Sequence, residues 1–189
     1  MSIDDPLGHT LLTIARNAIE KKFDRPARVV TPHPDLAKPA ATFITLTQQG
    51  QLRGCIGTLE AHRPLAADVA ENALAAAFRD PRFPPLRQGE LDITRVEVSL
   101  LDTPEPLHFF DEAGALAQLH PGVDGLILQC GSHRATFLPQ VWESLQTPQL
   151  FLQHLKLKAG LPVAFWSPQL TLERYGVQKW KEPCFNQLP

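Results

Sequence analysis

The chain of 189 residues has few cysteines, no long apolar run and almost no net charge. Its three cysteines, Cys55, Cys130 and Cys184, are odd in number and widely spaced, which excludes a disulfide framework and a zinc knuckle. No stretch approaches the roughly 18 apolar residues of a membrane helix, so no membrane span is expected. The acidic and polar segment MSIDDPLGHT is not typical of a signal peptide, and we expect a cytoplasmic protein with reduced thiols.

The charge balance and several missing motifs exclude other functions. A formal net charge of −2 gives no support for a general nucleic-acid surface, which needs clustered lysine and arginine. There is no GxxxxGK[ST] or GxGxxG loop to hold phosphates and no GxSxG nucleophile turn. There is also no CxxxCxxC ligand set for an iron–sulfur cluster and no obvious facial-triad pattern. We therefore expect neither a cofactor nor a metal site.

Apolar residues recur with helical spacing in three segments. Residues 6–22 follow Asp5 as an N-cap, residues 65–79 are rich in alanine, and residues 148–159 follow Thr147 as a second N-cap. These patterns predict three helices. The abundance of alanine in the second segment favours close approach of that helix to a neighbouring element.

Other segments are rich in β-branched and aromatic residues or alternate between apolar and polar side chains. They predict two β-hairpins and two further strands, over residues 41–47 with 51–59, 125–130 with 134–138, 91–102 and 170–175. Because strands and helices do not alternate strictly along the chain, the pattern favours an α+β fold.

The segment LRGCIGTL, residues 52–59, carries the strongest chemical signal. On a regular strand, Arg53 and Cys55 point to the same side, where a guanidinium can stabilise a thiolate. Gly54 and Gly57 have no Cβ, so a ligand or another backbone can approach them closely. The segment is therefore a candidate site for an activated cysteine.

Glu97 lies on the polar face of the strand 91–102 and is the candidate partner of this site. If that strand is a neighbour of residues 51–59, Glu97 shares a face with Arg53 and Cys55, where it can pair with the guanidinium or act as a base. The same residues fit a structural interpretation, because a free cysteine usually packs as a small apolar residue and an exposed ion pair contributes little. Spacing alone leaves both interpretations open.

Five blocks of sequence, in this order along the chain, resemble the AMMECR-type domain family. They are LRGCIGTL, LAADVAENALAAAFRDPRFPPL, ELDITRVEVSLL, ATFLPQVWESL and KLKAGLP, and the resemblance covers about residues 7–180. The blocks resemble the prokaryotic form of the family, the A proteins of the AmmeMemoRadiSam system. The resemblance implies that residues 1–189 form a single α+β domain with two lobes. The larger lobe would hold both chain ends and a sheet flanked by helices, and the smaller lobe would be mainly β.

The resemblance implies less about activity, because the biochemical activity of the family is not established. It implies association with a Memo-like protein and a radical SAM enzyme in a shared modification pathway. It also implies a site with Cys55 as nucleophile or redox thiol. The other expected site residues are Arg53 and Glu97 as catalytic groups and Gly54, Gly57 and Arg82 as substrate-binding groups. The alternatives are a non-catalytic module that binds a protein or presents a substrate, and an RNA binder, which the charge disfavours.

Overall fold

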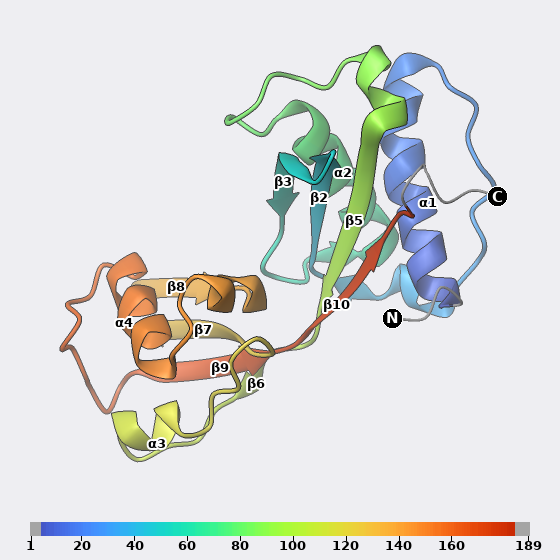
Figure 1. Cartoon of the computed structure of the whole chain (residues 1–189). Coiled ribbons are helices and arrows are strands. Elements are labelled where there is room, and N and C mark those ends of the chain that lie inside the picture. Colours follow the sequence, from blue (N-terminus) through green and yellow to red (C-terminus); the bar gives the residue numbers. More distant parts are fainter. Residues whose placement is uncertain (1–4, 184–189) are drawn as a thin grey trace. The chain divides into compact units, whose positions relative to one another are not determined.

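The computed structural model describes residues 5–183, and the chain divides into two compact units (Figure 1). Unit 1 contains the residues up to Leu101 together with those from Gln178 onward. Unit 2 is the continuous segment Asp102–Val177. Each unit has its own hydrophobic core. The extent of a single family domain over residues 1–189 stays a prediction.

Unit 1 contains two long helices. Helix α1 (Pro6–Glu20) begins after Asp5, whose carboxylate accepts a hydrogen bond from the backbone N–H of Leu7 at 3.0 Å. Helix α2 (Leu65–Phe78) begins after Pro64. The unit also has three short 3₁₀ helices, η1 (Lys21–Phe23), η2 (Pro34–Ala37) and η3 (Gln88–Ile93).

The sheet of unit 1 has four strands in the order β10-β5-β2-β3. These are β2 (Thr42–Gln48), β3 (Gln51–Gly57), β5 (Thr94–Leu101) and β10 (Val177–Lys181), and a separate two-residue pair joins β1 (Pro39–Ala40) to β4 (Arg63–Pro64). Strand β2 pairs antiparallel with both β3 and β5. On one face of β2 and β5, alternate apolar residues are buried beneath the two helices, namely Ile44, Leu46, Val96 and Val98. One face of the sheet is therefore core, and the other is available for polar residues.

Unit 2 contains a second four-stranded sheet in the order β6-β9-β7-β8. Its elements are β6 (Glu105–Pro106), α3 (Glu112–Leu116), β7 (Gly125–Cys130), β8 (His133–Phe137), η4 (Pro139–Glu143), α4 (Pro148–Lys158) and β9 (Thr171–Tyr175). In its core, the rings of Trp142 and Phe151 stack with centroids 3.9 Å apart. Thr147 caps α4 through a hydrogen bond from Leu150 N–H, as its place before Pro148 predicted.

The α+β fold class is confirmed, as are the three predicted helices and both hairpins. The sequence patterns did not predict β10 or α3. In the part of the chain that the structure describes, no helix has the length and apolar character needed to cross a membrane.

Candidate functional site

Cys55 lies in the second half of β3, and the residue is partly exposed. Thr45 of the middle strand β2 pairs with a residue of each neighbouring strand. It lies directly opposite Cys55 of β3 and directly opposite Glu97 of β5. Residues directly opposite each other share a face of the sheet. Cys55, Thr45 and Glu97 therefore form a row across three strands, which we call the Cys55 row.

Within the Cys55 row a thiol contacts a hydroxyl, and at its far end the carboxylate pairs with an ammonium group of the next strand. The Oγ1 atom of Thr45 lies 3.4 Å from Cys55 Sγ, and either atom can donate. The carboxylate of Glu97 lies 3.7 Å from Nζ of Lys181 on β10. Neighbouring strands are about 4.8 Å apart, so the backbones of Cys55 and Glu97 are roughly 10 Å apart. Glu97 can therefore act on the sulfur only through Thr45 or a bound molecule.

One condition of the expected site is not met, and Arg53 does not share a face with Cys55. Strand β2 separates β3 from β5, so the strands of Cys55 and Glu97 are not neighbours. Arg53 is the extra residue of a β-bulge, because Leu46 pairs with Gly54 whereas the next residue of β2, Thr47, pairs with Leu52. A bulge breaks the alternation of side chains that would have placed Arg53 beside Cys55.

Arg53 is instead buried and takes Glu90 of η3 as its carboxylate partner. Its Nε and Nη2 atoms donate to the two carboxylate oxygens of Glu90 at 2.9 and 3.2 Å. This hydrogen bonding, with a further bond from Gln48, lowers the pKa of Glu90 to about 2, although partial burial opposes the shift. The remaining nitrogen of Arg53, Nη1, is buried without a hydrogen-bond partner. Arg53 therefore anchors the bulge to η3.

A second arginine, Arg82, lies at the backbone of Cys55. Because β3 is an edge strand, the outward N–H and C=O groups of Cys55 have no strand partner. The N–H donates to Asp80 Oδ2 at 2.8 Å, and the C=O accepts a hydrogen bond from Arg82 Nη2 at 3.1 Å. Arg82 also donates to both oxygens of Asp80, at 2.9 and 2.6 Å. The two side chains together saturate the edge of the sheet at Cys55.

Asp80 is a site residue that the sequence reasoning missed, as are Thr45 and Glu90. The side chain of Asp80 is only 2% exposed. Hydrogen bonding from Arg82, with further bonds from backbone N–H groups of Cys55 and Arg82, holds the pKa of Asp80 well below its usual range despite burial. The Asp-Pro that ends α2 was the available signal, because a carboxylate at that point can turn back towards a neighbouring strand.

The two glycines beside Cys55 are in close contact with the protein itself. A Cβ added at Gly54 would lie 2.2 Å from the backbone oxygen of Ala76 in α2. A Cβ added at Gly57 would lie 2.2 Å from the ring of Phe43. The close approach that the sequence predicted is thus made by a helix at Gly54 and by an aromatic ring at Gly57.

A buried carboxylate holds the chain that follows β3. Asp68 of α2 is fully buried and accepts hydrogen bonds from Thr42, Thr58, Arg63 and Asn72. Thr58 directly follows Gly57, so this network ties the end of β3 to the start of α2. A satisfied buried network of this kind restricts the conformation of its segment. It stiffens the strand that carries Cys55.

The structure describes one of the two remaining cysteines. Cys130, a free cysteine in β7, lies in unit 2, and Cys184 lies outside the described residues. Over residues 5–183, no three His, Cys, Asp or Glu side chains are grouped so that they could hold a metal ion.

Comparison with known proteins identifies the family of this chain. The family model AMMECR1 matches residues 12–180. The chain belongs to the AMMECR1 family. An AMMECR1 relative from Methanothermobacter thermautotrophicus is 40% identical over 184 residues, which cover 93% of this chain and 94% of the relative. Protein MJ0810 of Methanocaldococcus jannaschii is 36% identical over 184 residues, covering 93% of this chain and 90% of that protein.

A solved structure shows the same fold. The crystal structure of uncharacterized protein PH0010 from Pyrococcus horikoshii matches with a TM-score of 0.79 and 31% sequence identity. The match covers 95% of this chain and 93% of that chain. The AMMECR1 relatives are uncharacterised. The comparisons therefore establish the family and the fold but give no information about activity.

Proposed function

We propose that this AMMECR1 chain is a cysteine-dependent enzyme in which Cys55 is the nucleophile or redox thiol. The observation that carries the proposal is the partly exposed residue Cys55, whose thiol is hydrogen bonded to Thr45 on the polar face of the unit 1 sheet. The family resemblance adds a modification pathway shared with Memo-like and radical SAM proteins. We place this pathway in the cytoplasm, in line with the few and widely spaced cysteines of the sequence.

The neighbours of Cys55 suggest how such an enzyme would work. A thiol attacks as the thiolate, so its proton must leave first. Thr45 orients the sulfur, and Glu97 receives the proton through Thr45 or through a hydroxyl of the substrate. Asp80 and Arg82 hold the backbone of Cys55 in place, so the thiol is positioned before a substrate arrives.

Alkylation of the native protein tests this proposal. Iodoacetamide is applied at a series of pH values from about 5 to about 9, and mass spectrometry of peptides measures the labelling rates of Cys55 and Cys130. We expect Cys55 to react faster than Cys130 at pH values where an ordinary thiol is protonated. Thr45→Val should slow the reaction at Cys55 and leave Cys130 unchanged.

The matched control is Cys55→Ser, which should abolish the fast phase alone. Labelling of Cys55 that begins only after denaturant is added would overturn the proposal. Equal rates at Cys55 and Cys130 over the whole pH range would also overturn it, because the surroundings of Cys55 would then confer no activation.

A non-catalytic module that binds a protein or presents a substrate is the second candidate. The observation that favours it is the exposure of two apolar residues beside the site, Leu52 at 44% and Leu59 at 39%. A module of this kind predicts that Cys55→Ser restores the phenotype of a deletion strain, whereas Leu52→Asp with Leu59→Asp does not. The enzyme predicts failure of Cys55→Ser.

A further inference from the structure

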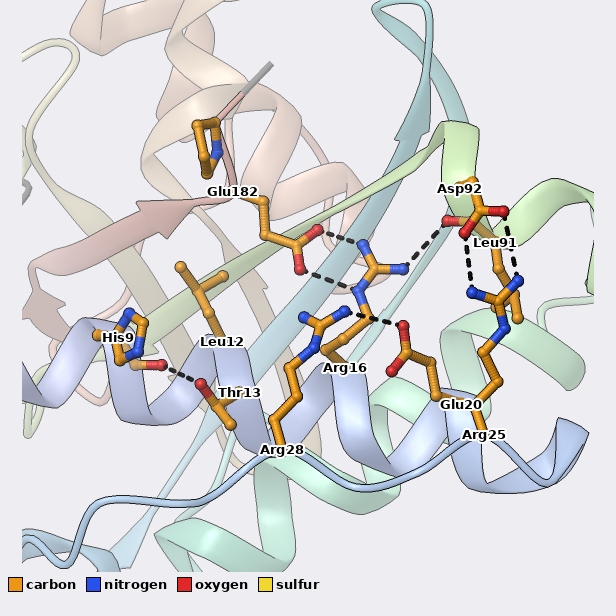
Figure 2. Close-up of a pocket in the computed structure, with 11 residues that line it drawn as sticks. His9, Leu12, Thr13, Arg16, Glu20, Arg25, Arg28, Leu91, Asp92 and Glu182 are labelled. Atoms are coloured by element: carbon orange, nitrogen blue, oxygen red, sulfur yellow. Dashed lines mark hydrogen bonds and ion pairs between the residues drawn. The ribbon is translucent and has the colours of Figure 1, made fainter. Parts of the chain in front are cut away.

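Unit 1 contains a cavity of about 280 Å³ beside α1 (Figure 2). Its walls come from α1, from the loop after α1, from η3 and from the residues that follow β10. None of the residues of the Cys55 row lines it. Its size suits a small metabolite rather than a nucleotide cofactor. Three arginine–carboxylate pairs surround it, and their exposure and hydrogen bonding differ.

The first pair is part of the framework of the cavity. The side chain of Arg16 is 3% exposed and pairs with Glu182 through two nitrogens. It also donates to the carbonyl oxygens of Leu91 and Thr94, at 3.2 and 2.7 Å. Every part of this guanidinium is therefore committed to the protein, and a ligand would gain nothing by displacing its partners.

The second pair is exposed to solvent. Arg25 donates to both oxygens of Asp92, at 3.0 and 3.3 Å, and the two side chains are 37% and 73% exposed. This bidentate pair uses both carboxylate oxygens, so it is satisfied at the surface.

The third pair has unused hydrogen-bonding capacity. Arg28 donates from Nη2 to Oε1 of Glu20 at 3.0 Å, and this is the one side-chain hydrogen bond that either group makes within residues 5–183. The side chain of Arg28 is 56% exposed, whereas that of Glu20 is 8% exposed. Among the described residues, the buried side-chain atoms without a partner do not include Oε2 of Glu20, so solvent still reaches this oxygen although most of the side chain is buried. Oε2 of Glu20 and the other N–H groups of Arg28 are thus open positions of opposite charge beside the cavity.

The alternation of charge selects the class of ligand. The three arginines of the cavity are balanced by three carboxylates, so the charged residues of the lining have no excess of one sign. A simple anion would be attracted by Arg28 and repelled by Glu20, and a simple cation would meet the reverse. A molecule that carries both charges a short distance apart satisfies both groups. Leu12 supplies an apolar wall for the rest of such a molecule.

We propose that this cavity binds a small zwitterion of the α-amino acid class. The ammonium group of the ligand binds Glu20, its carboxylate binds Arg28, and its side chain lies against Leu12. In an α-amino acid one carbon joins the two charged groups, which matches the direct contact between Glu20 and Arg28. The site is separate from the thiol chemistry proposed for Cys55.

Binding to the full-length protein tests the proposal. Free glycine, L-leucine, L-glutamate and L-lysine are titrated to millimolar concentration into ¹⁵N-labelled protein, and amide shifts are followed by NMR. We expect at least one amino acid to shift the amides of α1 and of the loop at Arg25 and Arg28. Its carboxamide, which lacks the carboxylate, and its deaminated acid, which lacks the ammonium group, should each bind at least about tenfold more weakly.

Variants locate the site. Arg28→Gln and Glu20→Gln should each weaken binding by at least about tenfold, with thermal unfolding used to confirm that the variants fold. Arg79→Gln is the matched control, since it removes an exposed pair with Glu71 on α2 at 3.3 Å, away from the cavity. Arg28 is largely exposed, so that variant remains informative if Glu20→Gln is unstable. Absence of shifts with all four amino acids, or equal binding of the deaminated acid, would overturn the proposal.

Discussion

At the scale of single residues, carboxylates distant in sequence hold the backbone and side chains around Cys55. Asp80 accepts a hydrogen bond from the N–H of Cys55. Glu90 accepts a hydrogen bond from the guanidinium of Arg53, which lies two residues before Cys55. Both carboxylates have a lowered pKa because their arginine partners favour the charged form. The segment that carries the thiol is thus held from both sides by charged groups that only the fold brings to it.

The lowered pKa of Glu90 predicts how stability depends on pH. A carboxyl group whose pKa is lower in the folded state binds protons more readily when unfolded, so its contribution is complete above its ordinary pKa of 4.5 and is lost as the pH falls towards about 2. Glu90→Gln should remove about 1 to 2 kcal/mol of this pH-dependent contribution, an amount reduced by the partial exposure of the group.

Urea unfolding at several pH values between neutral and strongly acidic measures this effect. The difference in unfolding free energy between the natural protein and Glu90→Gln should be largest near neutral pH and should shrink in acid. Asp92→Asn, in a largely exposed pair with Arg25, is the control and should change stability little at any pH. A difference for Glu90→Gln that does not vary with pH would contradict the prediction.

At the scale of elements, the contact between α2 and β3 depends on the absence of a side chain. Gly54 lies against the backbone oxygen of Ala76, which cannot move without moving the helix. This contact is what the alanine-rich composition of α2 predicted, namely close approach to a neighbour. It also sets the position of β3 relative to Asp80, the residue directly after Arg79, which is the C-cap of α2.

Gly54→Ala should therefore be strongly destabilising. The added Cβ would lie 2.2 Å from Ala76 O, so α2 and β3 must separate, and we expect a loss of about 2 to 4 kcal/mol in the free energy of unfolding. Gly89→Ala is the matched control, because nothing lies within 4 Å of its added Cβ and its φ is not positive. Chemical denaturation of the two variants measures the contrast. Equal stability would show that the helix and the strand adjust freely.

At the scale of the whole chain, unit 2 is a continuous segment with its own core. Its fully buried residues include Leu126, Leu128, Phe151 and Leu152. The two ends of the segment are adjacent, since Asp102 N–H donates to the carbonyl oxygen of Gly176 at 3.0 Å. A segment whose ends meet and whose apolar residues pack together satisfies the requirements of an autonomous folding unit.

We therefore predict that residues 102–177 fold when expressed alone. The stacked pair of Trp142 and Phe151 supplies the readout, because burial of the indole shifts its fluorescence and the folded fragment should unfold cooperatively in urea. The fragment is short, so its stability should be marginal, on the order of 3 to 5 kcal/mol. Phe151→Ala, which removes a fully buried ring, should abolish the transition. A fragment without a cooperative transition would refute autonomy.

Much of the fold could be predicted because its signals are local. Asp5 caps α1, and Thr147 precedes Pro148 at the start of α4, as the sequence indicates. The turn of the first hairpin has positive φ at Gln49 and Gly50, as a short hairpin turn needs. Strand β10 could not be predicted, because its five residues pair with a strand that ends more than seventy residues earlier in the chain.

The candidate site was predicted in part. Cys55 and Glu97 do lie on one face of the sheet, although with Thr45 between them. Arg53 left the expected face because of a bulge, and Arg82 donates directly to the backbone carbonyl of Cys55. The catalytic and substrate-binding roles of Cys55, Arg53, Glu97, Gly54, Gly57 and Arg82 stay predictions.

The sequence by itself determined the helices, the hairpins, the α+β class and the segment in which to look for chemistry. Caps, turns and periodicity depend on residues a few positions apart, whose interactions are largely the same in any fold. Tertiary structure alone decided which carboxylate meets which arginine, that a hydroxyl lies beside the sulfur, and that a charged cavity forms beside α1. Those contacts join residues far apart in the chain, and their geometry depends on strand order and on the single bulge at Arg53, which no local pattern encodes.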